Sequence, residues 1–243
     1  MYSFDSVIRY SELDNQGQLN IEALLNYFQD CSIFHSESLG YGVEYLKEHH
    51  IMWVLSSWQI EIDRLPALCE KVTVGTFPYD FKGFFGYRNF YLKDEAGEYI
   101  AKANTLWTLL DTDALRPVVP PADMKEAYVL SPKLEMVDAG RKIAVPEGGE
   151  PKETITVGVH HLDTNHHVNN VQYVKMAMAF LPSDFHVSRL RVEYKKQALL
   201  HDVIKPYVVQ AQQENGQSVY VVSLQDENGT VYVNVEFSGI EKV

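Results

Sequence analysis

The sequence predicts an α+β fold in which one unit, a helix followed by an antiparallel sheet, occurs twice. In each half a polar loop leads into a stretch with apolar residues at helical spacing. Long runs rich in Val, Tyr, Phe, Ile and Thr follow, and Gly-containing turns separate them. The two halves also match each other at a constant offset, which is the pattern of a duplicated unit.

The offset is the same at two separate places. Glu61 and Glu193 occupy matching segments, and 193 − 61 = 132. Asp94 and Asp226 occupy a second matching pair, and 226 − 94 is again 132. A period of this length is too long for a solenoid, so each half is expected to be a domain in which the sheet wraps around the helix.

Within each half the expected order is the same. A short strand comes first, at 6–10 in the first half and 154–160 in the second, and a polar loop and a helix follow. Asn20 is a good N-cap for the first helix. The apolar positions are Ile21, Leu24, Leu25, Phe28 and Cys31 in the first helix and Val171, Val174 and Met178 in the second, which Pro182 ends.

The strands after each helix are expected to be joined by turns at 94–97, 215–216 and 226–229. The loops before the helices match at 163 − 14 = 149, so the first half has 149 − 132 = 17 extra residues, expected around 40–50. Pro and Gly residues between the halves indicate a linker. The expected domains are 1–125 and 151–243, with the linker at 126–150.

Composition excludes several classes of function. The chain has 243 residues and a net charge of −12, which argues against a nucleic-acid-binding surface. No apolar run approaches the about 18 residues that span a bilayer, and the first residues do not resemble a secretory signal, so a cytoplasmic protein is expected. Two cysteines, Cys31 and Cys69, are too few for a four-sulfur zinc site and are expected to be reduced.

The most informative motif is Leu-Asp-Thr-Asn-His-His-Val-Asn-Asn-Val at 162–171. Asp163, Asn165 and His167 alternate, so an extended loop would project all three side chains to one side. The helix that starts behind them offers free N–H groups and a positive dipole end. A carboxylate, an amide and an imidazole in this setting can perform acyl-transfer chemistry. The alternative is a polar loop that only caps the helix.

The first half lacks this combination of side chains. Asp14 matches Asp163, but the positions of Asn165 and His167 are occupied there by glutamines, Gln16 and Gln18. Only the second half therefore has an ionisable imidazole in the loop. Duplication followed by loss of one active site explains this pattern.

These motifs resemble the acyl-acyl-carrier-protein thioesterases of plants and bacteria, whose fold is a tandem hotdog. Besides 162–171, the segments 83–88, 94–97 and 103–111, together with Arg116, are similar to segments of that family. The resemblance implies hydrolysis of the thioester that joins a fatty acyl chain to acyl carrier protein. It implies no cofactor and no metal, and it implies a catalytic loop of Asp163, Asn165 and His167.

The sequence departs from the family at two positions. Gln197 stands where the family has a catalytic Glu, and Ala198 stands where the family has a Cys. Because Ala198 has no thiol, direct attack by water is the expected route, with Asp163 or His167 taking the proton. Asn165 would orient water or the substrate carbonyl, and Gln197 can position water. The oxyanion would be held by the backbone N–H groups of Val168, Asn169 and Asn170.

Two binding surfaces follow from the resemblance and from charge. The first half is expected to form the acyl-chain pocket, with the candidate lining residues Trp53, Trp58, Phe84, Phe85 and Trp107. An acidic carrier protein needs a local basic patch, for which the candidates are Arg189, Arg191, Lys195, Lys196 and Lys205. The alternative for these cations is a solvated strand face.

Three other interpretations remain open at this stage. The first is a non-catalytic acyl-binding or regulatory module, and the second is a hydratase or dehydratase on the same fold. The third is a zinc site formed from His160, His161, His166 and His167, although consecutive His residues point opposite ways in an extended chain. Either a monomer with a pseudo-dimeric core or a homodimer is expected, because a tandem pair can complete its sheet internally.

Overall fold

A computed structural model describes residues 1–137, 139–212 and 217–241. The chain divides into two compact units, one of residues 1–56 and 60–138 and the other of residues 57–59 and 139–243. The main break, after residue 138, falls inside the segment 126–150. The expected turn at 215–216 lies outside the described residues.

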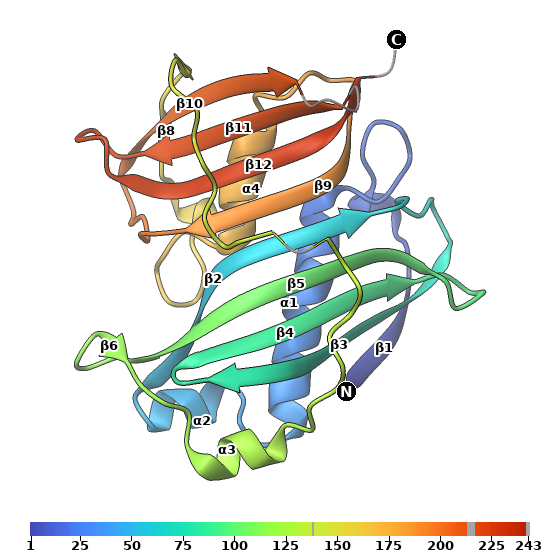
Figure 1. Cartoon of the computed structure of the whole chain (residues 1–243), viewed down its shortest axis with the longest axis vertical. Coiled ribbons are helices and arrows are strands. Elements are labelled where there is room, and N and C mark those ends of the chain that lie inside the picture. The colour runs from blue at the N-terminus through green and yellow to red at the C-terminus, as the bar shows by residue number, and fades with distance from the viewer. Residues whose placement is uncertain (138, 213–216, 242–243) are drawn as a thin grey trace. The chain divides into compact units, whose positions relative to one another are not determined.

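The first unit is an antiparallel sheet with one long helix against it, and its short strand β6 pairs with β5. The strand order is β1-β3-β4-β5-β2, and Figure 1 shows α1 lying behind β3, β4 and β5. Its elements are β1 (Tyr2–Val7), η1 (Tyr10–Glu12), α1 (Ile21–Ser38), α2 (Val43–Glu48), β2 (Ile51–Ile62), β3 (Lys71–Lys82), β4 (Phe85–Lys93), β5 (Tyr99–Asp111), β6 (Arg116–Pro117) and α3 (Ala122–Ala127).

The core of this unit lies between α1 and the sheet. Asn20 caps α1 as expected, because its side chain accepts the N–H of Ala23. The apolar stripe of α1 is buried, and the rings of Phe28 and Phe90 pack with their centroids 5.5 Å apart. Leu24 and Phe28 are fully buried, so the helix is held mainly by this apolar face.

The second unit repeats the arrangement with a shorter helix. The strand order is β9-β12-β11-β10, and the short strands β7 and β8 pair with β10. Asn169 caps α4 by accepting the N–H of Val171. The elements are β7 (Glu150–Pro151), β8 (Ile155–Thr156), η2 (Val159–His161), α4 (Asn170–Met178), β9 (Phe185–Tyr194), β10 (Val203–Gln212), β11 (Ser218–Gln225) and β12 (Val231–Glu241).

The duplication extends to individual backbone hydrogen bonds. The Cys69 N–H donates to the Ile8 carbonyl at 3.0 Å, and the His201 N–H donates to the Val157 carbonyl at 3.0 Å. Cys69 and His201 both have a positive φ, 65° and 72°. Residues 69 and 201 are 132 apart, and residues 8 and 157 are 149 apart. The two sequence offsets, 132 and 149, therefore align residues that make the same hydrogen bond in the two units.

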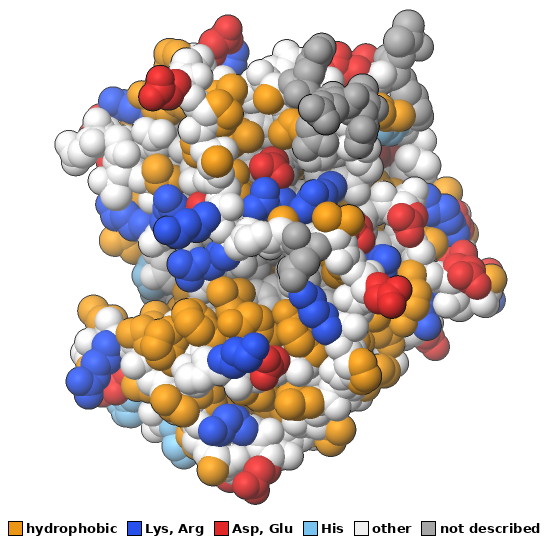
Figure 2. Space-filling view, in the orientation of Figure 1, with side chains coloured by type: hydrophobic (Ala, Val, Ile, Leu, Met, Phe, Trp, Pro, Cys, Tyr) orange, Lys and Arg blue, Asp and Glu red, His pale blue; other side chains and the backbone are white. Residues whose placement is uncertain are grey.

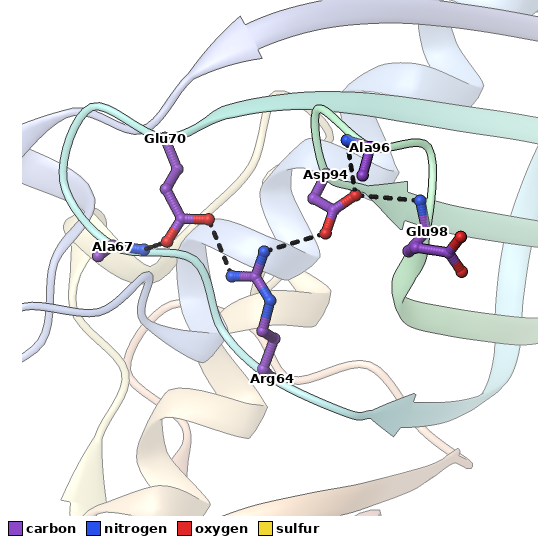
Figure 3. Close-up of polar contacts among 6 residues, drawn as sticks. All are labelled: Arg64, Ala67, Glu70, Asp94, Ala96 and Glu98. Carbon is purple, nitrogen blue, oxygen red and sulfur yellow. Dashed lines mark hydrogen bonds and ion pairs between the residues drawn. The ribbon is translucent and has the colours of Figure 1, made fainter.

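An ion pair at the β4–β5 turn of the first unit is also duplicated at the β11–β12 turn of the second unit. Arg64 Nη2 donates to Asp94 at 3.2 Å, and Lys196 Nζ donates to Asp226 at 3.0 Å. Arg64 also donates to Glu70 at 2.8 Å, so it bridges two carboxylates from different turns (Figure 3). The cation thus links the turn after β2 to the β4–β5 turn, and Lys196 makes the equivalent link in the second unit.

The first strand of each unit differs from the expectation. The strands are Tyr2–Val7 and Ile155–Thr156, and the chain turns into η1 or η2 where the expected strands would end. The reason is local, because the Glu12 carboxylate accepts the Arg9 N–H at 2.9 Å and so closes a turn. The extra residues of the first half are also not confined to 40–50. The α1 helix has 18 residues and α4 has nine, so the insertion is shared between a longer helix and α2.

The linker is fixed to each unit by a matching glutamate. In the first unit the Val137 N–H donates to Glu61 at 2.7 Å, and in the second unit the Ile143 N–H donates to Glu193 at 3.2 Å. Figure 1 shows the chain after α3 running on the side of the first sheet that faces away from α1. These linker segments therefore follow the outer faces of the sheets and leave the helix faces to the core.

Candidate active site

Residues 163–167 form a tight turn and not the extended loop that was expected. The Asp163 N–H donates to the His167 carbonyl at 2.8 Å, and the His166 N–H donates to the Asp163 carbonyl at 3.1 Å. Asp163 Oδ1 accepts the N–H groups of Asn165 at 2.8 Å and His167 at 3.2 Å. A carboxylate that captures the N–H two residues on forms an Asx turn. The shape of this segment is therefore set by the Asp163 carboxylate and not by strand alternation.

The first unit contains the same turn without the same side chains. Asp14 Oδ1 accepts the N–H groups of Gln16 at 2.8 Å and Gln18 at 3.0 Å. At the fourth position Gly17 has φ 77°, and His166 has φ 61° at the equivalent place. A left-handed backbone suits glycine and is strained for a residue with a side chain. The loop scaffold is therefore common to both units, whereas the imidazole at 167 and the strain at 166 occur only in the second.

Two of the three N–H groups predicted to hold an oxyanion are already bonded. The Val168 N–H donates to the Ala198 carbonyl at 3.1 Å, and the Asn169 N–H donates to the His161 carbonyl at 2.9 Å. The prediction for Val168 and Asn169 is therefore wrong in this structure. Among the described residues no acceptor is found for the Asn170 N–H. Asn170 is the first residue of α4, where the positive end of the helix dipole lies.

The imidazole of His167 is unusual in its bonding. Its Nδ1 is buried and has no hydrogen-bond partner among the described residues. Buried polar atoms are normally satisfied, so this nitrogen is an exception that leaves an acceptor or donor free beside the start of α4. Next to it, the Tyr194 hydroxyl donates to the Asn170 carbonyl at 3.0 Å and fixes the first turn of α4.

Gln197 lies next to a peptide that contacts the loop directly. The Ala198 carbonyl accepts the Val168 N–H, and the Ala198 N–H donates to the Tyr173 hydroxyl at 2.7 Å. Burial raises the pKa of Tyr173 to about 12, so this hydroxyl stays neutral. Ala198 is fully buried and Gln197 is exposed. This arrangement keeps the Gln197 backbone beside the end of the 163–167 turn.

The cysteines do not offer a nucleophile near this loop. Cys31 and Cys69 are both in the first unit and both are free thiols. Burial raises the pKa of the Cys31 thiol to about 12, so it carries no thiolate near neutrality. Attack by water remains the route that the residues of the second unit can support.

The histidines around the loop have separate roles. His161 Nδ1 accepts the Gly158 N–H at 3.0 Å, so this ring is committed to the backbone. His160 lies against it with ring centroids 3.9 Å apart, and His166 is exposed. Within the described residues, His, Cys, Asp and Glu side chains do not gather in a group of three that could hold a metal ion.

The five aromatic candidates for the acyl pocket do not lie together. Trp107 is paired with Gly86 across β4 and β5, and Trp53 packs against Gly86, so both indoles are on the α1 side of the first sheet. Phe85 belongs to the opposite face, because it is paired with Thr108. Phe84 packs against Phe85 in the β3–β4 turn, and Trp58 is buried in a segment of the second unit.

Two of the predicted cations, Arg189 and Arg191, lie on β9, and Lys195 and Lys196 follow it. Figure 2 shows Lys and Arg side chains gathered over the β9 region of the second unit. Arg191 is not available to a partner, because it pairs with Glu236 at 2.9 Å and donates to the carbonyls of Gly140 and Lys142. The Arg191 side chain is only 14% exposed.

The other cations of the patch differ in their freedom. Lys196 pairs with Asp226, whereas Lys195 is 44% exposed and its nearest carboxylate oxygen, on Glu193, is 3.9 Å away. Arg189 buries its Nε without a partner among the described residues. Lys195 is therefore the most available cation of the predicted set, and Arg191 is a structural residue.

Comparison with known proteins identifies the family. The acyl-ACP thioesterase N-terminal domain matches residues 2–128, and the acyl-ACP thioesterase C-terminal domain matches residues 147–238. The chain belongs to the acyl-ACP thioesterase family. Its fold is the tandem hotdog of that family: an acyl-ACP thioesterase from Bacteroides thetaiotaomicron superposes with a TM-score of 0.89 at 22% identity, covering 98% of this chain and 97% of the other.

Other family members are similarly distant in sequence. The 12:0-ACP thioesterase from Umbellularia californica has a TM-score of 0.89 at 20% identity, over 99% of this chain and 94% of that chain. An oleoyl-acyl carrier protein thioesterase from Arabidopsis thaliana is 22% identical, over 88% of this chain and 65% of its own length. An acyl-[acyl-carrier-protein] hydrolase from Cuphea viscosissima is 27% identical, over 86% and 54%. The chain thus spans between half and two thirds of these plant proteins.

Most of the site residues expected from the family lie in the second unit. The structural role of one further residue there was not predicted from the sequence. His161 was considered only as a possible metal ligand, but it accepts a backbone N–H and its carbonyl holds the N-cap of α4. At the offset of 149 residues, His161 aligns with Glu12, and Glu12 makes the same hydrogen bonds in the first unit. Within the described residues, no helix is both long and apolar enough to cross a membrane.

Proposed function

We propose that this chain hydrolyses the thioester of fatty acyl-acyl carrier protein and releases free fatty acid and carrier protein. The observation that carries the proposal is the duplicated Asx turn. Both units have the turn, but only the second has an imidazole in it, and that imidazole has a buried, unsatisfied nitrogen. Membership of the acyl-ACP thioesterase family supports the same reaction.

In the proposed reaction, His167 is the general base. Asp163 Oδ1 already accepts two backbone N–H groups, so that oxygen is occupied in holding the turn. His167 has a ring nitrogen with no hydrogen-bond partner among the described residues, and an imidazole is the side chain that most often acts as a general base. Asp163 fixes the loop, and the exposed Asn165 amide orients the water or the substrate carbonyl.

The reaction balances without a covalent enzyme intermediate. Water attacks the thioester carbonyl carbon while the imidazole of His167 takes the water's proton. Negative charge develops on the carbonyl oxygen, where the Asn170 N–H and the positive end of α4 stabilise it. The carbon–sulfur bond then breaks, and the leaving thiolate takes the proton from the imidazolium. The products are a fatty acid and the thiol of the carrier protein.

The decisive test is thiol release from carrier-protein thioesters with a series of acyl lengths. The wild-type chain is expected to turn over, and His167→Ala is expected to lose about 10²–10⁴-fold in kcat. Gln18→Ala alters the equivalent residue of the first unit and is the matched control, expected to keep full activity. Tight acyl binding without thiol release by the wild type would favour a non-catalytic binding module instead.

The substrate-binding surfaces belong to the proposal as well. Trp53 and Trp107 share the helix side of the first sheet and are the best candidates for contact with the acyl chain. Lys195 is the best candidate for contact with the acidic carrier protein, because its side chain is 44% exposed and its nearest carboxylate oxygen is 3.9 Å away, whereas Lys196 is paired with Asp226 at 3.0 Å. Lys195→Glu is expected to raise KM for acyl-carrier protein while leaving hydrolysis of a short pantetheine thioester unchanged.

The proposal also covers the assembly and the cellular location. A monomer or homodimer fits a tandem hotdog, and light scattering of the purified chain at several concentrations decides between them. The curated relatives named above are chloroplastic, whereas a cytoplasmic location is proposed here from the sequence. Cell fractionation of the native host tests that location.

A further inference from the structure

The 3₁₀ turn that precedes the catalytic loop is closed by a histidine side chain. In η2 the N–H of Gly158 donates to His161 Nδ1 at 3.0 Å, and the His161 N–H donates to the Gly158 carbonyl at 3.0 Å. The two bonds form a reciprocal cap over a single turn. The His161 carbonyl also accepts the Asn169 N–H at 2.9 Å. His161 thus holds the chain on both sides of the five-residue catalytic turn.

The first unit makes the same cap with a different residue. The Arg9 N–H donates to Glu12 Oε2 at 2.9 Å, and the Glu12 N–H donates to the Arg9 carbonyl at 3.1 Å. The Glu12 carbonyl accepts the Asn20 N–H at 2.8 Å, as His161 does for the second N-cap. The position therefore requires a hydrogen-bond acceptor, and the catalytic unit supplies it with an imidazole.

An imidazole and a carboxylate differ as acceptors. Nδ1 of His161 can accept only while it carries no proton, so the ring must be the neutral tautomer with its hydrogen on Nε2. Imidazolium has an N–H on both nitrogens and would repel the Gly158 N–H. A carboxylate such as Glu12 keeps an acceptor oxygen at any pH at which a protein is normally assayed.

The surroundings of His161 favour the neutral ring. Burial lowers the pKa of His161, and His160 on the same turn and Lys175 on α4 lower it further. The His160 ring lies 3.9 Å from the His161 ring between centroids. These are the titratable and charged groups that act on His161 in the described structure. Around neutral pH the cap is therefore formed, and it is lost as the pH falls below the ordinary range of histidine.

We propose that His161 is a positioning residue for hydrolysis, which holds the loop of Asp163, Asn165 and His167 in its working shape only while its ring is neutral. The inference rests on the proposed function. It assigns part of the acid limb of the pH–rate profile to His161, which acts through the loop. His161 does not touch the reacting atoms, and its effect is on their placement.

The first unit provides the residue for the test. His161→Glu introduces the acceptor found in the twin and is expected to keep kcat within about twofold of wild type at pH 8. Because the carboxylate cap survives acid, its kcat should fall less than the wild-type kcat between pH 7 and pH 5. His161→Ala removes the acceptor and should lower kcat about three- to tenfold at every pH, with KM little changed. Glu12→Ala removes the equivalent cap from the first unit and should leave kcat within twofold.

Two results would overturn the proposal. One is an acid limb of His161→Glu that coincides with that of the wild type, and the other is an unchanged kcat in His161→Ala. NMR gives a readout that does not depend on activity, because the Gly158 and Asn169 amide protons should titrate together with the His161 ring and lose that transition in His161→Glu. If the wild type releases no thiol, the proposed function fails, and these amide titrations alone still decide whether His161 is a proton-sensitive cap.

Discussion

Removing the carboxylate of each duplicated turn separates the structural from the catalytic role of the loop. Asp163→Ala deletes an oxygen that accepts N–H groups at 2.8 and 3.2 Å, and Asp14→Ala deletes one that accepts N–H groups at 2.8 and 3.0 Å. The two substitutions therefore remove nearly equal hydrogen bonding. They differ in what the turn contains, since only the second turn has His167.

The expected loss of stability follows from the exposure of the turns. A hydrogen bond from an N–H to a carboxylate contributes about 1.5–3 kcal/mol when it is well shielded, and exposure reduces this. Both aspartates are half-buried and the N–H groups that donate to them lie in exposed loops, so each deletion should cost about 1–2 kcal/mol in total. For a chain of this length that is a fall in Tm of about 2–8 °C.

The assay combines calorimetry with thiol release. Asp163→Ala and Asp14→Ala should lower Tm by similar amounts, but kcat should fall about 100-fold or more for Asp163→Ala and stay within twofold for Asp14→Ala. The equal loss of stability makes Asp14→Ala an internal control for misfolding. The reasoning is refuted if both variants lose activity equally, or if Asp163→Ala keeps wild-type kcat.

Three further predictions concern single residues. Burial, aided by the neighbouring Arg88 guanidinium, lowers the pKa of His35 to about 3, so the chain should lose about 3 kcal/mol of stability as the pH falls from 6.5 to 4. Urea titrations at pH 7 and pH 4 measure this loss, and His35→Gln should flatten the pH dependence. His166→Gly, which restores the residue type of Gly17, should relieve the left-handed strain and raise Tm by about 2–4 °C, and an unchanged or lower Tm would contradict the strain. Gln197→Glu should raise kcat, and an equal or lower kcat would show that Gln197 is not at the family's catalytic position.

Local signals in the sequence predicted local structure correctly. The cap of α1 by Asn20 depends only on the residues that follow it, and the structure confirms it. The duplicated sheets were visible because apolar alternation and a constant offset persist along the whole chain. The first strands were misplaced because a side chain, that of Glu12, accepts a backbone N–H and turns the chain earlier than the apolar pattern suggests.

The geometry of the candidate site could be predicted only in part. The residue types at 163, 165 and 167 were evident, but the shape of the loop was not, because the Asp163 side chain takes two backbone N–H groups and replaces an extended chain by a turn. The bonds of Val168 and Ala198 join segments 30 residues apart, so the sequence motif alone gave no sign that this N–H was occupied. The alignment of His161 with Glu12 was available in the sequence and would have identified the cap.

We propose that the imidazole at position 167 makes the second turn catalytic while the equivalent turn of the first unit is inert. Thiol release from a fatty acyl-carrier protein by His167→Gln and by Gln18→His tests this by exchanging the paired residues. We expect kcat to fall about 100-fold or more in His167→Gln and to stay at the wild-type value in Gln18→His. Wild-type turnover by His167→Gln would contradict it.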